Sequence, residues 1–309
     1  MTSPAGLRTA ALVAAFALST AVLDTVQPAT GADSRPARGA PSAAVTISRP
    51  ELPRGGFQLF PRYFLVAYYG TAHTPAMGVL GEGSPARMTR RLRQAARPFR
   101  ASGKKVQIVY ELIVSIADAH PGPDGNYSHF IPRAYVERFV ALARRNRALL
   151  VLDLQPGRQS FAPQASRFRW ALREPFVGLA LDPEWRMGPH QVPARSIGSV
   201  RAGEINRVSR FVASVTRANH LPQKVFMVHQ FRREMVRNIE DVKRRDGLAM
   251  IQHIDGFGSR RAKLATFHHV AEPSQFSLGF KLFYDEDTDM FAPRDVLRIR
   301  PRIRYVSYQ

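Results

Sequence analysis

Short apolar runs alternate with longer amphipathic stretches from about residue 57 to the end of the chain. The short runs are rich in β-branched and aromatic residues, which is typical of buried strands, and the longer stretches have the spacing of helices that cover a core. The eight predicted strands are 63–69, 106–112, 148–154, 176–184, 225–230, 248–254, 276–283 and 303–308. Helical patterns lie between them at about 86–102, 132–146, 161–174, 199–221, 232–246, 259–273 and 292–300.

Strands that alternate regularly with helices indicate an α/β protein, and this number of units predicts a single-domain (β/α)8 TIM barrel at residues 57–309. Because the last predicted strand runs to the C-terminus, we expect the eighth outer helix to be missing. An open doubly wound sheet is the alternative. Such a sheet usually has a glycine-rich phosphate turn after its first strand. Here Gly70-Thr71-Ala72-His73 follows that strand, which favours the barrel.

Polar or small side chains alternate with large apolar ones along the predicted strands. A barrel with a site at its mouth requires this pattern, because alternate residues face the lumen and the outer helices. Lys281 shares a strand face with Gly279, Glu111 with Gln107, and Asp153 is followed two residues later by a glutamine. The opposite face of each strand is large and apolar, as expected for a surface that packs against outer helices. The polar face is therefore predicted to line the lumen.

Residues 176–185, FVGLALDPEW, form the most informative stretch of the chain. Period-two alternation places Asp182 and Glu184 on the same face as Gly178 and Ala180, with the two carboxylates about 6–7 Å apart if the strand continues. Two acids at the end of a small-lined strand are typical of the catalytic end of an α/β barrel. An acid pair that only caps the next helix or binds arginine is the structural alternative.

Polar side chains follow every predicted strand at its C-terminal end. In strand order they are Tyr69 and His73; Glu111; Asp153; Asp182, Glu184 and Trp185; His229 and Gln230; Asp255; Lys281, Tyr284 and Asp285; and Ser307, Tyr308 and Gln309. Burying so many polar groups costs stability unless they pair or bind a ligand. We therefore predict a functional pocket at the barrel mouth.

The chemistry of this ring favours glycoside hydrolysis, in which one protonated carboxylic acid assists the leaving oxygen and a second carboxylate attacks or stabilises the sugar. Glu184 is the predicted general acid, and Asp182, Glu111 and Asp255 are the candidates for its partner. Trp185 is a candidate for stacking on a sugar face, with a tryptophan of the core as the alternative interpretation. The remaining residues predicted to bind substrate are Tyr69, Glu111, Asp153, His229, Gln230, Asp255, Lys281, Asp285 and Gln309.

A metal-dependent hydrolase is a rival interpretation, because His73, His229 and His253 with Asp255 or Glu111 are able to ligate a cation. No His-x-His or His-Glu-x-x-His spacing occurs, so no metal ligand and no cofactor is assigned from the sequence. A serine hydrolase is poorly supported because Gly-x-Ser-x-Gly is absent.

The composition is strongly basic, with a formal net charge of +21. Such a charge favours anionic partners, including anionic wall polymers. The arginines are scattered over helical patterns and no aromatic-interleaved basic motif occurs, so nucleic acid is not favoured as a partner. The chain has no cysteine, which excludes disulfides, thiolate chemistry and cysteine-linked lipid anchoring.

The N-terminus has the pattern of an export signal, with Arg8 before an apolar run and the small residues of 30–32 as a cleavage site. We expect a signal peptide at residues 1–32 and a disordered linker rich in Pro, Ala and Arg at residues 33–56. No stretch of the mature chain is apolar over enough residues for a stable membrane span. The predicted location is extracellular or associated with the cell wall.

The stretches AYYGT, YELI, LDPEW, VHQF, HIDGFG, GFKLFYDEDT and YVSYQ together resemble a group of secreted bacterial TIM-barrel proteins, commonly described as lipoproteins, that has no assigned activity. More distantly, Asp182-Pro183-Glu184 is similar to the Asp-x-Glu of chitinase-like and muramidase-like barrel glycosidases. That resemblance implies Glu184 as proton donor and Asp182 as the group that steers an acetamido or oxocarbenium centre. The chain departs from those families at Val177 and Ala180, where chitinase-like strands carry further aspartates.

The sequence thus predicts a secreted glycoside hydrolase-like barrel that acts on a polysaccharide or cell-wall glycan. Two alternatives stay open: a non-catalytic barrel that binds glycan or cell wall, and a metal-dependent hydrolase. An open mouth with a reachable Glu184 favours the enzyme. A mouth closed by arginine–carboxylate pairs favours the binding protein.

Overall fold

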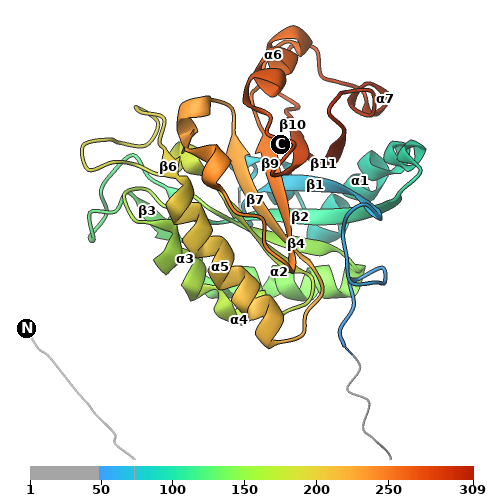
Figure 1. The fold of residues 1–309 in the computed structure, drawn as a ribbon, viewed down its shortest axis with the longest axis horizontal. Coiled ribbons are helices and arrows are strands. Elements are labelled where there is room, and N and C mark those ends of the chain that lie inside the picture. Colours follow the sequence, from blue (N-terminus) through green and yellow to red (C-terminus); the bar gives the residue numbers. More distant parts are fainter. Residues whose placement is uncertain (1–48, 73) are drawn as a thin grey trace, which may run out of the picture. The chain divides into compact units, whose positions relative to one another are not determined.

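Eight parallel strands form a closed barrel in the computed structural model, which describes residues 49–309 except residue 73 (Figure 1). The barrel closes because β1 pairs with β2 on one side and with β11 on the other. In chain order the barrel strands are β1 (Tyr63–Gly70), β2 (Lys105–Ala117), β4 (Leu149–Leu154), β5 (Val177–Leu181), β7 (Lys224–Gln230), β9 (Leu248–Ile254), β10 (Ser277–Leu282) and β11 (Ile303–Tyr308). The predicted TIM barrel is confirmed.

Helices connect most of these strands and cover the barrel. They are α1 (Pro85–Ala96), α2 (Arg133–Asn146), α3 (Phe161–Arg167), α4 (Arg169–Leu172), α5 (Ala202–Ala218), α6 (Arg260–Val270) and α7 (Pro293–Val296). Ser84 and Ser259 cap α1 and α6 by accepting hydrogen bonds from the third backbone amide beyond them. Figure 1 shows α3, α4 and α5 side by side along one flank of the barrel.

Short elements decorate the barrel. Strand β3 (Ser128–Phe130) pairs antiparallel with the last residues of β2, and β6 (Val200–Arg201) pairs with β8 (Val236–Arg237) in a separate two-stranded sheet. The 3₁₀ turns are η1 (Pro75–Met77), η2 (Val79–Gly81), η3 (Arg97–Ser102), η4 (Pro183–Trp185), η5 (Arg233–Met235) and η6 (Ile239–Asp241). Of these, η1 and η4 lie beside the barrel mouth.

The helix predicted at 232–246 is wrong. That segment is fully described and contains η5, β8 and η6, with no α-helix. The buried residues of the segment, Met235, Val236 and Val242, have a spacing that suits a helix, but Val236 pairs with β6 instead. Asn238 also adopts a left-handed conformation, with φ of 58°, which interrupts any helix at that point.

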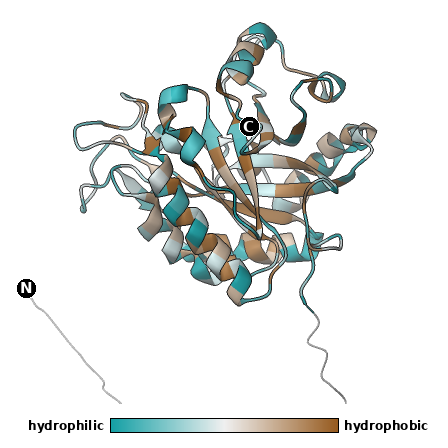
Figure 2. Cartoon of the chain, in the orientation of Figure 1, coloured by the Kyte–Doolittle hydropathy of each residue, from teal (hydrophilic) through white to brown (hydrophobic). Residues whose placement is uncertain are grey.

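The barrel strands are buried on both faces, and their residues are correspondingly hydrophobic. In Figure 2 the strands are mostly hydrophobic, whereas α5 carries hydrophobic and hydrophilic bands along its length. This pattern follows from position, because the strands lie between the lumen and the outer helices while each helix has one face in water. Several polar residues of the strands, among them Glu111, Asp153 and His229, face the lumen instead.

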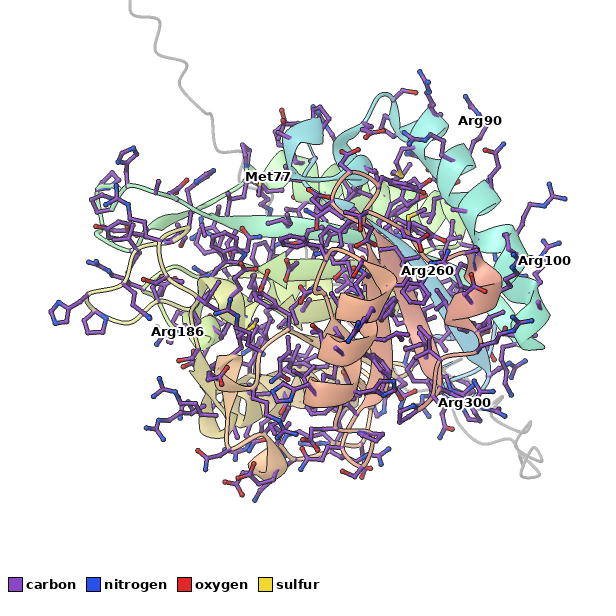
Figure 3. All side chains as sticks on the ribbon, turned by 90° about the horizontal axis from the view of Figure 1, so that it is seen from above. Met77, Arg90, Arg100, Arg186, Arg260 and Arg300 are labelled. Atoms are coloured by element: carbon purple, nitrogen blue, oxygen red, sulfur yellow. The ribbon has the colours of Figure 1, made fainter. Side chains whose placement is uncertain are left out.

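The excess of positive charge lies at the surface. Figure 3 shows Arg90, Arg100 and Arg300 at the periphery of the fold. Among the described residues, none of the three makes an ion pair with a carboxylate. Exposed cations of this kind contribute little to the stability of the fold.

Residues 49–56, assigned above to the linker, pack against the barrel. Leu52 is buried, and the Arg49 guanidinium donates hydrogen bonds to the backbone oxygens of His220 and Leu221, both at 3.1 Å. The predicted signal peptide at 1–32 and the linker residues 33–48 lie outside the described residues. In the part of the chain that is described, no helix has the length and apolar character needed to cross a bilayer.

Candidate active site

A cavity of about 550 Å³ opens at the end of the barrel where the parallel strands terminate. Each of the eight strands contributes a lining residue at or just beyond its C-terminal end: Tyr69, Ala117, Gln155, Asp182, Phe231, Asp255, Lys281 and Gln309. Barrel enzymes place their active sites at this end because the strand ends and following loops converge there. This mouth cavity is therefore the candidate active site.

A second cavity of about 550 Å³ lies at the start of β2, at the opposite end of the barrel. Its charged lining residues are all cations: Arg54, Arg93, Arg97, Arg100, Lys105 and Arg147. Acid–base chemistry on a sugar needs carboxyl groups, which this cavity lacks. It is therefore not the candidate catalytic site.

Glu184 stands on the wall of the mouth cavity, in the turn η4 that follows β5. The strand predicted to reach Glu184 ends at Leu181, because Pro183 has no amide hydrogen to continue the ladder. Among the described residues the Glu184 carboxylate has no hydrogen bond or ion pair, while its backbone oxygen accepts one from Gly198 at 2.7 Å. Burial, followed by the charge of Asp255, raises the pKa of Glu184 to about 7.

Asp182 lies deeper, at the end of β5, and only 3% of its surface is exposed. Small residues are required beneath it, because a Cβ at Gly178 would lie 2.5 Å from the backbone oxygen of Val225. One carboxylate oxygen, Oδ1, is buried without a hydrogen-bond partner. Burial raises the pKa of Asp182 well above its usual range, and although His229 opposes this shift, Asp153, Glu184 and Asp255 add to it.

Asp255 is the third acid of the cavity, and two basic side chains hold it in place. The His229 ring lies 2.9 Å away, Nδ1 to Oδ2, and the Lys281 ammonium lies 3.9 Å from the same oxygen. Burial alone would raise the pKa of Asp255, but the hydrogen bond and charge of His229 and the charge of Lys281 lower it. Lys281 is itself fixed 3.6 Å above the centre of the Tyr69 ring.

Glu111 and Asp153 lie below the cavity, fully buried in the lumen. The Tyr305 hydroxyl donates to Glu111 Oε2 at 2.8 Å, and the Tyr69 hydroxyl donates to Asp153 Oδ2 at 2.9 Å. The other oxygen of each carboxylate faces His229, whose Nε2 lies 3.0 Å from Glu111 Oε1 and 3.8 Å from Asp153 Oδ1. Burial opposes ionisation of Glu111, but its close contact with His229, together with His253 and Lys281, lowers its pKa to about 2.

His253 joins the same lumen cluster from β9. Its Nε2 lies 3.1 Å from the Ser307 hydroxyl, and its Nδ1 faces Glu111 Oε1 at 4.0 Å. Burial lowers the pKa of His253 to about 3, which keeps this ring neutral. The pKa of His229 moves in the opposite direction: burial disfavours its charged form, but Asp153, followed by Asp255 and Glu111, raises the pKa well above its usual range.

Aromatic side chains form the apolar part of the cavity. Trp185, Phe231, Phe257 and Phe283 all line it. Phe257 is 65% exposed and lies edge-on to Phe283, with ring centroids 5.8 Å apart. Exposed rings beside carboxylates are suited to stacking on the apolar face of a sugar.

The structure brings most of the predicted site residues to the mouth and separates others from it. Glu184, Asp182, Tyr69, Trp185, Asp255, Lys281 and Gln309 line the cavity, whereas Glu111, Asp153 and His229 lie beneath it. Gln230 points away from the lumen, because its amide oxygen accepts a hydrogen bond from Gln252 at 2.7 Å, on the side covered by α6. Asp285 is exposed and does not line the cavity, and His73 lies outside the described residues.

Several residues of the site were not recognised in the sequence. Tyr305 donates a hydrogen bond to Glu111 from within β11, two residues before Ser307. Period-two alternation with Ser307 was the sequence signal that could have placed Tyr305 in the lumen. Lys263 was also missed. It forms a buried ion pair with Asp287 at 2.9 Å and donates to the backbone oxygens of Gly256 and Lys281. No local pattern marks a helix lysine that points inward to support a loop.

Comparison with known proteins finds no matching protein-family profile and no matching curated protein. Similar solved structures include the endoglucanase ZgEngAGH5_4 in complex with a cellotriose, with 13% identity, a TM-score of 0.36 and coverage of 69% of this chain and 79% of that one. They also include a GH5-4 broad-specificity endoglucanase from Clostridium longisporum, with 10% identity, a TM-score of 0.33 and coverage of 76% of this chain and 80% of that one.

Proposed function

We propose that this barrel is a glycoside hydrolase that cleaves a polysaccharide or cell-wall glycan, with Glu184 as the proton donor. The observation that supports it most directly is an unpaired Glu184 carboxyl on the wall of an open cavity, facing other acids and flanked by aromatic rings. A proton donor must reach the glycosidic oxygen, so it has to be accessible and free of a competing partner. Glu184 meets both conditions.

The mechanism also needs a second carboxylate as nucleophile or base, and the candidates for it are the other acids that line the cavity. Glu111 is separated from the cavity by burial in the lumen, so it does not touch substrate in this proposal. Asp255 is the better placed of the remaining two, since His229 and Lys281 hold one of its oxygens and leave the other, Oδ1, without a partner. We assign it the role of nucleophile or base, and Asp182 the role of steering the substrate.

The non-catalytic alternative requires a mouth closed by arginine–carboxylate pairs. The carboxylates that line the cavity instead face a histidine and a lysine, or no partner at all. This arrangement supports an enzyme. Export of the protein, which would bring it to an extracellular glycan, is part of the same proposal and rests on the N-terminal sequence pattern.

The test is a reducing-end assay of the purified protein on a panel of neutral, acetamido and acidic glycans. Glu184→Gln keeps the shape of the side chain and removes its proton, and should lower turnover at least about 100-fold on any substrate found. Glu240→Gln alters an exposed acid of η6 and serves as the matched control with unchanged turnover. Retained activity in Glu184→Gln would contradict the proposal.

A further inference from the structure

Three buried side chains beneath the mouth cavity turn free donor atoms toward one another. Glu111 Oε1, His229 Nε2 and His253 Nδ1 come from β2, β7 and β9 and lie within 4.8 Å of one another, with 3.0 Å and 4.0 Å from Glu111 to the two ring nitrogens. All three residues are fully buried. None of the three atoms has a hydrogen-bond partner, so even the 3.0 Å contact is not aligned as a hydrogen bond.

The opposite atom of each of these side chains is fixed by a neighbour. His229 Nδ1 pairs with Asp255 Oδ2 at 2.9 Å, His253 Nε2 with the Ser307 hydroxyl at 3.1 Å, and Glu111 Oε2 accepts from Tyr305 at 2.8 Å. Metal-bound histidines and carboxylates are held in this way, because the outer hydrogen bond sets the tautomer and aims the free lone pair at the ion. With Nδ1 of His229 donating to Asp255, its Nε2 presents a lone pair to Glu111.

A cation is needed at the point where these atoms converge. A buried polar atom without a partner destabilises the fold, and opposed lone pairs add repulsion. A second proton on His229 is one way to supply the charge. One proton on Nε2, however, leaves His253 Nδ1 unpartnered, and the contact to Glu111 lacks hydrogen-bond alignment. A metal ion satisfies all three atoms at once.

We propose that Glu111, His229 and His253 bind one divalent transition-metal ion, Zn²⁺ by their donor types, in the lumen below the mouth cavity. Two imidazole nitrogens and one carboxylate oxygen are a donor set that Zn²⁺ takes and that Ca²⁺ and Mg²⁺ do not favour. Zinc–ligand distances of about 2.0–2.2 Å place neighbouring donors about 3.3 Å apart, which lies between the 3.0 Å and 4.0 Å that separate Glu111 Oε1 from the two ring nitrogens. Asp153 Oδ1, unpartnered and 3.8 Å from His229 Nε2, lies beside the three converging donors but is not one of them.

The position of the ion determines its role. Its three principal ligands do not line the mouth cavity, so the ion orders the barrel interior and offsets the charge of the lumen carboxylates rather than contacting a substrate. The proposal is independent of glycan hydrolysis. An inactive protein that binds zinc supports the metal site alone, and an active protein without zinc supports only the proposed enzyme.

The experiment uses the full chain, stripped with a chelator and then titrated with ZnCl₂ by calorimetry, with metal content measured by mass spectrometry. We expect one Zn²⁺ per chain and a rise in melting temperature on loading. Glu111→Gln keeps the acceptor for Tyr305 but removes the charge, and should weaken Zn²⁺ binding at least about tenfold. His253→Asn should do the same.

The control is His190→Gln, which alters an exposed histidine and should leave zinc binding unchanged. If this variant loses the zinc, the ion is bound adventitiously at the surface and the proposal fails. Failure of the stripped wild type to bind zinc, or unaltered binding in both lumen variants, would also overturn it. If the lumen variants do not fold, Co²⁺-loaded wild type decides: an intense visible absorption band of tetrahedral Co²⁺ supports the site, and its absence refutes it.

Discussion

Replacing Glu184 by glutamine should make the protein more stable, by an amount that grows with pH. The pKa of Glu184 is raised from 4.5 to about 7 in the folded chain, mainly by burial and then by Asp255. Between these two values the folded state keeps the proton that the unfolded state has lost. Folding is then opposed as the pH rises, because the folded state binds more protons than the unfolded state. Glutamine has no proton to lose, so this penalty disappears.

The size of the effect follows from the two pKa values. At about 1.4 kcal/mol for each pH unit, the difference between 4.5 and about 7 corresponds to about 3 kcal/mol. The gain of Glu184→Gln over wild type should be near its baseline at pH 4, increase between pH 4.5 and 7, and level off above pH 7. If the Glu184 carboxylate instead stabilised the fold, its replacement would lower the free energy of unfolding.

Urea unfolding of both proteins at pH 4, 5.5, 7 and 8 measures this difference directly. Glu240→Gln, with an exposed carboxyl, is the control and should follow wild type at every pH. A difference between Glu184→Gln and wild type that does not change with pH would show that the carboxyl is not perturbed. A loss of stability that increases with pH would show that the ionised form is paired, which would refute the environment described for it.

Three further changes test other parts of the structure. Lys224 is buried, and its ammonium donates to the backbone oxygens of Glu174 and Val177. Burial lowers its pKa from 10.5 to about 7. Urea unfolding should therefore show the stability of wild type relative to Lys224→Met rising by about 4 kcal/mol between pH 7 and 10. Gly178→Ala should lower the free energy of unfolding by about 1–3 kcal/mol through the clash with Val225, whereas Gly203→Ala, which meets no atom within 4 Å in α5, should raise it by up to about 1 kcal/mol. Trp185→Ala should weaken the binding of any glycan ligand by about 0.5–1.5 kcal/mol in calorimetry without changing the pH profile of catalysis.

The barrel was predictable because its signals are local. Each strand is an apolar run bounded by turn residues, and period-two alternation correctly assigned Glu111, Asp153 and Lys281 to the lumen side. The segment 232–246 was mispredicted because its apolar spacing suits a helix, while the pairing of Val236 with β6 depends on a strand far away in the chain. Gln230 was assigned to the site from its place at a strand end, but alternation with His229 turns it outward.

The electrostatics of the site could not be predicted, because they depend on which groups meet across the barrel. Asp182 and Asp255 are both aspartates at strand ends, yet the pKa of one is raised and the pKa of the other is lowered. The difference arises from His229, which lies on β7 and holds Asp255 by a hydrogen bond while leaving Asp182 Oδ1 without a partner. Neighbouring acids in different environments take different roles, as general acid–base catalysis requires. His229 therefore helps to separate the pKa values of two neighbouring acids at the mouth, although its ring does not line the cavity.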